Sequence, residues 1–125
     1  MANPLKGEIE LVAGEVAYTL KFSIDAICSL EERLGKGFPA IAIEMQDPRR
    51  MTLGIVRHLL HASLGEMHPE VTLKEAGELI VAAGGMVEVL GKVSAAINAA
   101  FPVKAEASGE RRPPKPPKGR TGSNS

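Results

Sequence analysis

The strongest constraint on the fold is a period-two pattern of apolar residues near the N-terminus. Residues 8–22 read EIELVAGEVAYTLKF, in which apolar and polar side chains alternate on both sides of Gly14. Two alternating runs joined by a short glycine-containing connection predict a β-hairpin with one apolar face. A lone hairpin is only marginally stable in water, so we expect helices to cover that face.

Segments with helical periodicity and recognisable ends follow the hairpin. Ser23 can cap a first helix, in which apolar residues recur at helical spacing until Gly35. Pro39 favours the start of a short second helix, because its missing N–H costs little there. Thr52 begins a third helix, which we expect to run to about Gly65.

Two more helices are indicated in the last part of the apolar region. Thr72 and Glu75 have the T-x-x-E spacing of a capping box, which predicts a fourth helix. The glycine pair at 84–85 ends it, and a last helix is expected at about 86–101. The sequence therefore predicts an α+β fold, in which an N-terminal β-hairpin packs against a bundle of about four to five short helices.

The composition changes after residue 102. Residues 103–125 carry six Lys/Arg and two Glu, whereas residues 1–102 carry nine bases and thirteen acids, so an acidic body precedes a basic tail. The tail is rich in proline and glycine, and it cannot bury enough apolar surface to offset its chain entropy. We expect one domain at 1–102 and a disordered, basic, proline-rich tail at 103–125.

Composition also bounds the compartment and the partners. Hydrophobic residues make up 44% of the chain but aromatic residues only 3%, so we expect an aliphatic core. We identify no signal peptide and no run of apolar residues long enough to span a membrane, which favours a cytoplasmic protein. The tail cations lack interleaved aromatic residues and the body is acidic, which disfavours nucleic-acid binding relative to a solvated or docking segment.

All three histidines fall within the stretch RHLLHASLGEMHP, with His58 and His61 three residues apart and His68 beyond them. On a helical wheel, the first two lie opposite the apolar face. That face comprises Leu53, Val56, Leu60 and Leu64. We expect the two histidines to face water or a partner and not a pocket. The spacing lacks the H-E-x-x-H pattern, so adventitious metal binding is favoured over a functional zinc site.

The single cysteine, Cys28, lies between Ile24 and Leu30 in the first predicted helix. A reactive thiol needs a base and an electropositive setting, but the neighbours here are Glu31 and Glu32. We therefore expect Cys28 to be a core residue that behaves as a small hydrophobe. No phosphate-loop frame is present either. The sequence predicts a protein that is not an enzyme and has no catalytic, cofactor-binding or metal-binding residues.

The order of motifs resembles one known family. ANPLKGEIEL at 2–11 and GEVAYTLKFSIDAICSLEERLGKG at 14–37 are similar to the start of the gene transfer agent family of small phage-tail proteins, classed among tail assembly chaperones. The family's L-E-E/D-x-L/F-G element reads LEERLG at 30–35. The segments at 52–65 and 72–101 resemble its later helices. The tail and the histidine positions lie outside the resemblance.

The resemblance implies a non-enzymatic helper in the assembly of a siphophage-like tail, from a gene transfer agent or a prophage. Such chaperones bind the tape measure protein before the tail tube polymerises around it, and the tail tube protein is a further expected partner. The alternative is a structural tail or neck component that is retained in the particle. No small-molecule substrate and no membrane partner is implied, and homo-oligomerisation stays open.

A physical mechanism for such binding is a groove that receives an apolar helix. Apolar anchors of a helix recur at i, i+3, i+4 and i+7, and aliphatic and Met side chains suit tolerant binding. Ordinary core packing is the alternative for every candidate residue. The residues expected to line this groove are Ile41, Ile43, Met45, Met86, Val89 and Leu90.

Overall fold

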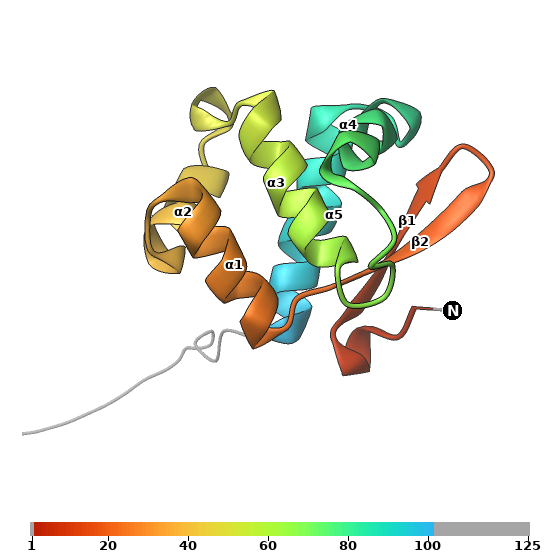
Figure 1. Ribbon diagram of the computed structural model, residues 1–125, viewed down its shortest axis with the longest axis horizontal. Coiled ribbons are helices and arrows are strands. Elements are labelled where there is room, and N and C mark those ends of the chain that lie inside the picture. The colour runs from red at the N-terminus through yellow and green to blue at the C-terminus, as the bar shows by residue number, and fades with distance from the viewer. Residues whose placement is uncertain (1, 102–125) are drawn as a thin grey trace, which may run out of the picture.

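The computed structural model describes residues 2–101, and the predicted disordered tail at 103–125 lies outside the described residues. The described chain forms a β-hairpin followed by five α-helices, which confirms the predicted α+β class (Figure 1). In chain order the elements are η1 (Pro4–Lys6), β1 (Glu8–Ala13), β2 (Val16–Lys21), α1 (Ile24–Leu34), α2 (Phe38–Met45), η2 (Pro48–Arg50), α3 (Leu53–Leu64), α4 (Leu73–Ala82) and α5 (Met86–Ala100).

The predicted hairpin forms around a two-residue turn. Strands β1 and β2 are antiparallel, with Leu11 opposite Tyr18 and Ile9 opposite Leu20. Gly14 begins the turn with φ of 65°, a left-handed conformation that glycine adopts without steric cost. Leu11 and Leu20 are buried, since α3 and α5 pack against the hairpin.

Local capping explains where the helices begin and end. The Ser23 side chain accepts a hydrogen bond from the backbone N–H of Ala26 at 3.0 Å, and Gly35 ends α1 with φ of 70°. Thr72 and Glu75 form the predicted capping box at the start of α4, with reciprocal bonds of 3.1 and 2.9 Å. These ends were predictable because each depends on residues close together in the sequence.

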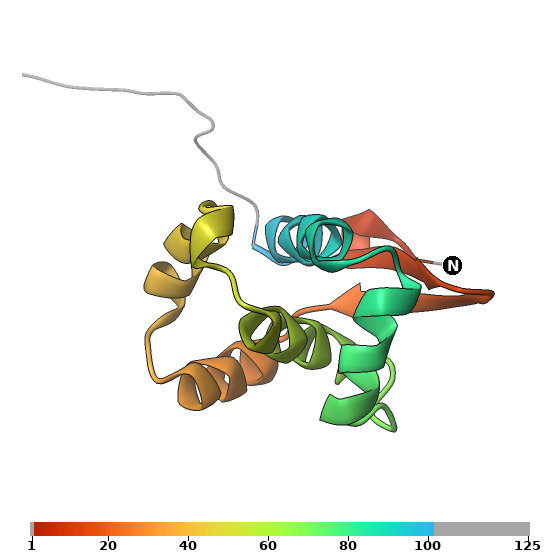
Figure 2. The same cartoon turned by 90° about the horizontal axis from the view of Figure 1, so that it is seen from above.

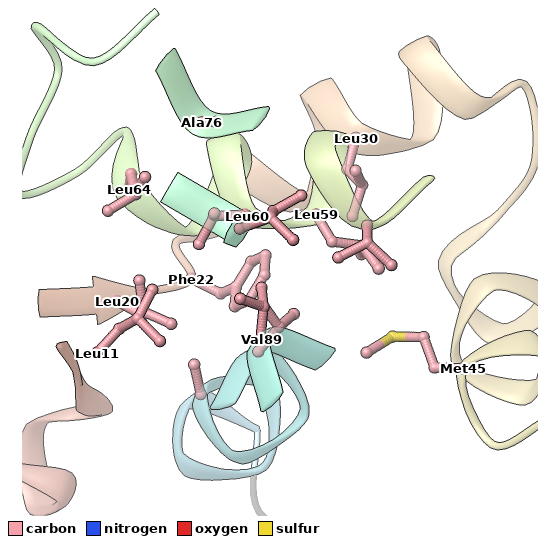
Figure 3. Close-up of a cluster of buried hydrophobic side chains, with 14 of the residues drawn as sticks. Leu11, Leu20, Phe22, Leu30, Met45, Leu59, Leu60, Leu64, Ala76 and Val89 are labelled. Carbon is pink, nitrogen blue, oxygen red and sulfur yellow. The ribbon is translucent and has the colours of Figure 1, made fainter. Parts of the chain in front are cut away.

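Helix α3 lies at the centre of the molecule. It contacts α1, α4, α5 and β2, and Figure 2 shows α1 and α3 in one layer with α5 and the hairpin in another. Leu59, Leu60 and Leu64 of α3 are fully buried among side chains from the hairpin and the other helices (Figure 3). Phe22 is the one buried aromatic residue within 2–101, so the described core is mainly aliphatic, as predicted.

Two predictions about side-chain burial were wrong. Cys28 is exposed, because it lies two positions, or about 200° of helical rotation, from the buried Leu30 on α1. Leu53 is 55% exposed although it lies on the apolar side of the wheel. It is the first residue of α3, where the helix has not yet entered the packed interior.

No helix within residues 2–101 is by itself long and apolar enough to cross a membrane. Helices α4 and α5 meet that criterion only when they are taken together, and they are bent by 113° relative to each other.

Candidate partner-binding groove

Three of the six residues predicted to bind a partner belong to the core. Ile41 and Met45 of α2 and Val89 of α5 are buried. Figure 3 shows the side chain of Met45 reaching from α2 toward the cluster that contains Val89. The apolar faces of α2 and α5 attach these helices to the body, so these three side chains belong to the core packing that was the alternative for each candidate.

The other three predicted residues are more accessible than these. Met86 and Leu90 are half-buried and pack against the core from α5. Ile43 is 69% exposed on α2. A pocket of about 140 Å³ lies between α2 and α5, the two helices that carry the six candidates. That pocket is lined by Ala42, Met45, Gln46, Ser94, Ile97 and Asn98.

A larger groove lies between α3 and α4, which pack against each other. Its volume is about 530 Å³. The wall from α3 consists of Leu53, Gly54 and Arg57, and the wall from α4 consists of Lys74, Gly77, Glu78 and Val81.

Two aliphatic side chains of this α3–α4 groove are exposed. Leu53, at the start of α3, is 55% exposed, and Val81, near the end of α4, is 80% exposed. Apolar surface left in water is a source of binding free energy, at roughly 25 cal/mol for each Å² that a partner covers, before the cost of association. The groove therefore offers an apolar contact surface with a polar edge.

Arg57 and Gly77 determine the shape of the groove floor. A Cβ atom at Gly77 would lie 3.0 Å from Cδ and 3.8 Å from Cγ of Arg57, so the arginine stem lies close against the α4 backbone. The Nε atom of Arg57 is buried and has no hydrogen-bond partner within the described residues. No carboxylate among residues 2–101 pairs with this guanidinium group, because the ion pairs in that region involve other bases. The groove thus contains a half-buried cation that has no ion-pair partner among residues 2–101.

A second pocket corrects the prediction for His58 and His61. Both are half-buried and line a pocket of about 260 Å³ between α1 and α3, together with Arg33 and Leu30 of α1. The prediction that they face water or a partner and not a pocket was wrong, because α1 packs along this side of α3. Burial of the ring lowers the pKa of His58, and the positive charges of Arg33 and Arg57 lower it further.

The remaining ring contacts of the histidines are structural. His61 Nε2 lies 3.1 Å from the carbonyl oxygen of Val71. Because a carbonyl oxygen can only accept a hydrogen bond, the ring nitrogen is the donor. His68 Nε2 accepts the backbone N–H of Thr19 at 2.9 Å. The three rings therefore serve different contacts. No three His, Cys, Asp or Glu side chains in the described part of the chain are grouped so as to hold a metal ion.

Comparison with known proteins gives no match from which a function of this groove could be inferred. No family model matches the chain, and neither the curated proteins nor the solved structures give a significant match. The resemblance to tail assembly chaperones therefore remains a prediction from the motifs.

The sequence contains one signal that points to the α3–α4 groove. Gly77 lies inside a helix, where glycine is unfavourable unless another group approaches closely. The close contact with Arg57 is such an approach. The sequence alone does not reveal that Leu53 and Val81 flank this contact, because that depends on how α3 and α4 dock.

Proposed function

We propose that this protein is a non-enzymatic phage-tail assembly chaperone that binds the tape measure protein during tail morphogenesis, in the cytoplasm of the bacterial host. The order of motifs, including LEERLG at 30–35, supports this proposal. The structural observation that carries the proposal is the α3–α4 groove, because Leu53 and Val81 are two exposed aliphatic residues that line one concave surface between two helices.

The proposed mechanism is protection of apolar helical surface. A tape measure protein is long and helical, and its apolar stripes would promote aggregation if they stayed exposed before the tube forms. A groove between two helices can receive one face of a third helix through ordinary helix packing. Aliphatic contacts without aromatic anchors favour tolerant and reversible binding, as a chaperone requires when the tube replaces it.

The test is co-expression with the tape measure protein, followed by recovery of the complex. We expect the wild-type chain to increase the amount of soluble tape measure protein, and Leu53→Asp combined with Val81→Asp to abolish this effect. Failure of the wild-type chain to bind the tape measure protein would contradict the proposed function. Unchanged recovery with the double variant would instead place the binding surface elsewhere.

The chain offers matched controls for both substitutions. Ile24 and Leu53 are each the first residue of a capped helix, and both are exposed aliphatic residues. Val87 on α5 is as exposed as Val81 but does not line the groove. Ile24→Asp combined with Val87→Asp should therefore leave recovery unchanged, because the variant adds the same charge outside the groove.

Mass spectrometry of purified particles separates the chaperone from a structural component. A chaperone that leaves before the tail is complete should be strongly depleted from the particles. A near-stoichiometric amount relative to other tail proteins would contradict the chaperone role and favour a structural tail or neck component.

A further inference from the structure

We infer that the α3–α4 groove selects a helix that carries an acidic side chain beside its apolar residues, and that this carboxylate pairs with Arg57. The identity of the natural partner as the tape measure protein rests on the proposed function. The chemistry of the occupant rests on the groove itself.

The first observation is the state of Arg57. Its stem lies against Gly77, and its Nε is buried without a hydrogen-bond partner within residues 2–101. A buried donor that has lost water and gained no acceptor is unfavourable. The side chain is half-buried and lines the groove, so a carboxylate from an occupant can reach the guanidinium group. Arginine suits this contact because its planar fork matches the two oxygens of a carboxylate.

The second observation is the local charge. The groove walls carry two bases, Arg57 and Lys74, and one acid, Glu78. None of the three takes part in an ion pair with another residue of the described chain. Residues 1–102 as a whole carry thirteen acids and nine bases. The groove is therefore a basic position on an acidic body, and an acidic helix would be attracted to it and repelled by most of the remaining surface.

The apolar flanks define the rest of the occupant. Leu53 and Val81 can contact aliphatic side chains on the same helix face as the acid. The chain's own segment 103–125 does not fit, because its six Lys/Arg and two Glu would place like charge against Arg57. The occupant that satisfies both features is an amphipathic helix with an Asp or Glu within one turn of its apolar anchors.

The experiment uses two designed helical peptides that differ at one position. Both carry leucines at i, i+3 and i+7 on an alanine-rich background; one has Glu at i+4 and the other has Gln. We expect the Glu peptide to bind the wild-type chain about tenfold more tightly than the Gln peptide, as for a partly desolvated charge pair. Titration calorimetry measures the two affinities, and amide shifts of α3 and α4 report the binding surface.

Substitution of Arg57 tests the residue assignment. In Arg57→Met, which keeps an unbranched stem, the preference for the Glu peptide should disappear. In the control Arg49→Met, which removes a fully exposed arginine on η2, the preference should remain. The peptide comparison on the wild-type chain needs no variant, so it remains decisive if Arg57→Met does not fold.

Several outcomes would overturn the inference. These are equal binding of the two peptides, binding of neither peptide, and a Glu preference that persists in Arg57→Met. A concentration-dependent dimer that Arg57→Met abolishes would also overturn it, because a second copy would then be the occupant.

Capture of the tape measure protein is measured in parallel. Capture that is insensitive to Arg57→Met refutes this inference alone, whereas a clear Glu preference without capture refutes the proposed function alone.

Discussion

The Nε2 atom of His68 accepts a hydrogen bond from the backbone N–H of Thr19 at 2.9 Å. This contact joins the segment between α3 and α4 to strand β2, across 49 positions of the chain. The same ring packs edge-on against Tyr18, with 5.2 Å between ring centroids. Because Nε2 accepts, it cannot carry a proton in this arrangement. His68 is thus a structural tether between the hairpin and the helices.

Removal of this tether should destabilise the fold. We expect His68→Ala to lower the free energy of unfolding by about 1–2 kcal/mol, because it removes a tertiary hydrogen bond and an aromatic contact. Denaturant unfolding followed by circular dichroism measures the change. Met67→Ala is the control, since Met67 is an exposed neighbour in the sequence. Equal stability of the two variants would show that the His68 contact contributes nothing.

Protonation of His58 should weaken the fold at acidic pH. Burial and the neighbouring cations lower the pKa of His58 in the folded state below its ordinary value of 6.5. The unfolded chain therefore binds more protons at this site as the pH falls. Above about pH 6.5, where His58 is neutral in both states, its contribution to the free energy of unfolding is fully present. That contribution is lost as the pH falls from there through the lowered folded-state pKa.

A substitution that removes the titrating group isolates this effect. We expect the free energy of unfolding of His58→Gln to fall less steeply between about pH 7 and pH 5 than that of the wild-type chain. Chemical denaturation at several pH values provides the slopes. The other histidines and the acidic residues are the same in both proteins, so they cancel in the comparison. Identical slopes would contradict a lowered pKa at His58.

Two glycines on helix surfaces test whether Arg57 can move. Glycine-to-alanine substitution inside a helix is stabilising by roughly 0.5–1 kcal/mol where space allows. Gly91 in α5 has nothing within 4 Å of an added Cβ, so Gly91→Ala should give this full gain. Gly77→Ala places its Cβ 3.0 Å from Arg57 Cδ, and the flexible stem must shift. We expect a smaller gain, of about 0.5 kcal/mol or less.

Thermal or denaturant unfolding of both alanine variants measures the difference. A loss of stability in Gly77→Ala by more than about 1 kcal/mol would mean that Arg57 is held rigidly, contrary to the open groove described above. Equal gains in the two variants would mean that the arginine does not lie against Gly77.

The exposed thiol of Cys28 should react in the folded protein. Because the side chain is exposed on α1, we expect Ellman's reagent to modify it at a rate similar to that of the denatured chain. A buried thiol would instead react only as fast as the protein opens. Protection of more than about tenfold would contradict the exposed position and would favour the core placement predicted from the sequence.

The parts of the fold that the sequence predicts are those set by local interactions. The turn at Gly14 and the caps at Ser23 and Thr72 each depend on residues within a few positions. The period-two pattern then specifies which face of the hairpin is buried. Because a hairpin with an apolar face is not stable alone, the pattern also predicts that helices pack against that face. These features agree with each other, which is why the fold class could be predicted.

The candidate site depends on packing between distant helices, which local patterns do not encode. An apolar stripe predicts that a helix buries one face, but not which of its residues stay at the edge. Ile41 and Val89 are buried because α2 and α5 use their stripes to attach to the body. Leu53 and Val81 remain exposed because the contact between α3 and α4 does not cover them.

Hydrogen exchange of the wild-type chain, alone and in complex with the tape measure protein, tests the central claim most directly. If the α3–α4 groove receives a helix, backbone amides in α3 and α4 should gain protection on binding, while those of η2 and the exposed side of α1 should not. Protection confined to α2 and α5, or no change anywhere in residues 2–101 despite complex formation, would contradict the assignment of this groove.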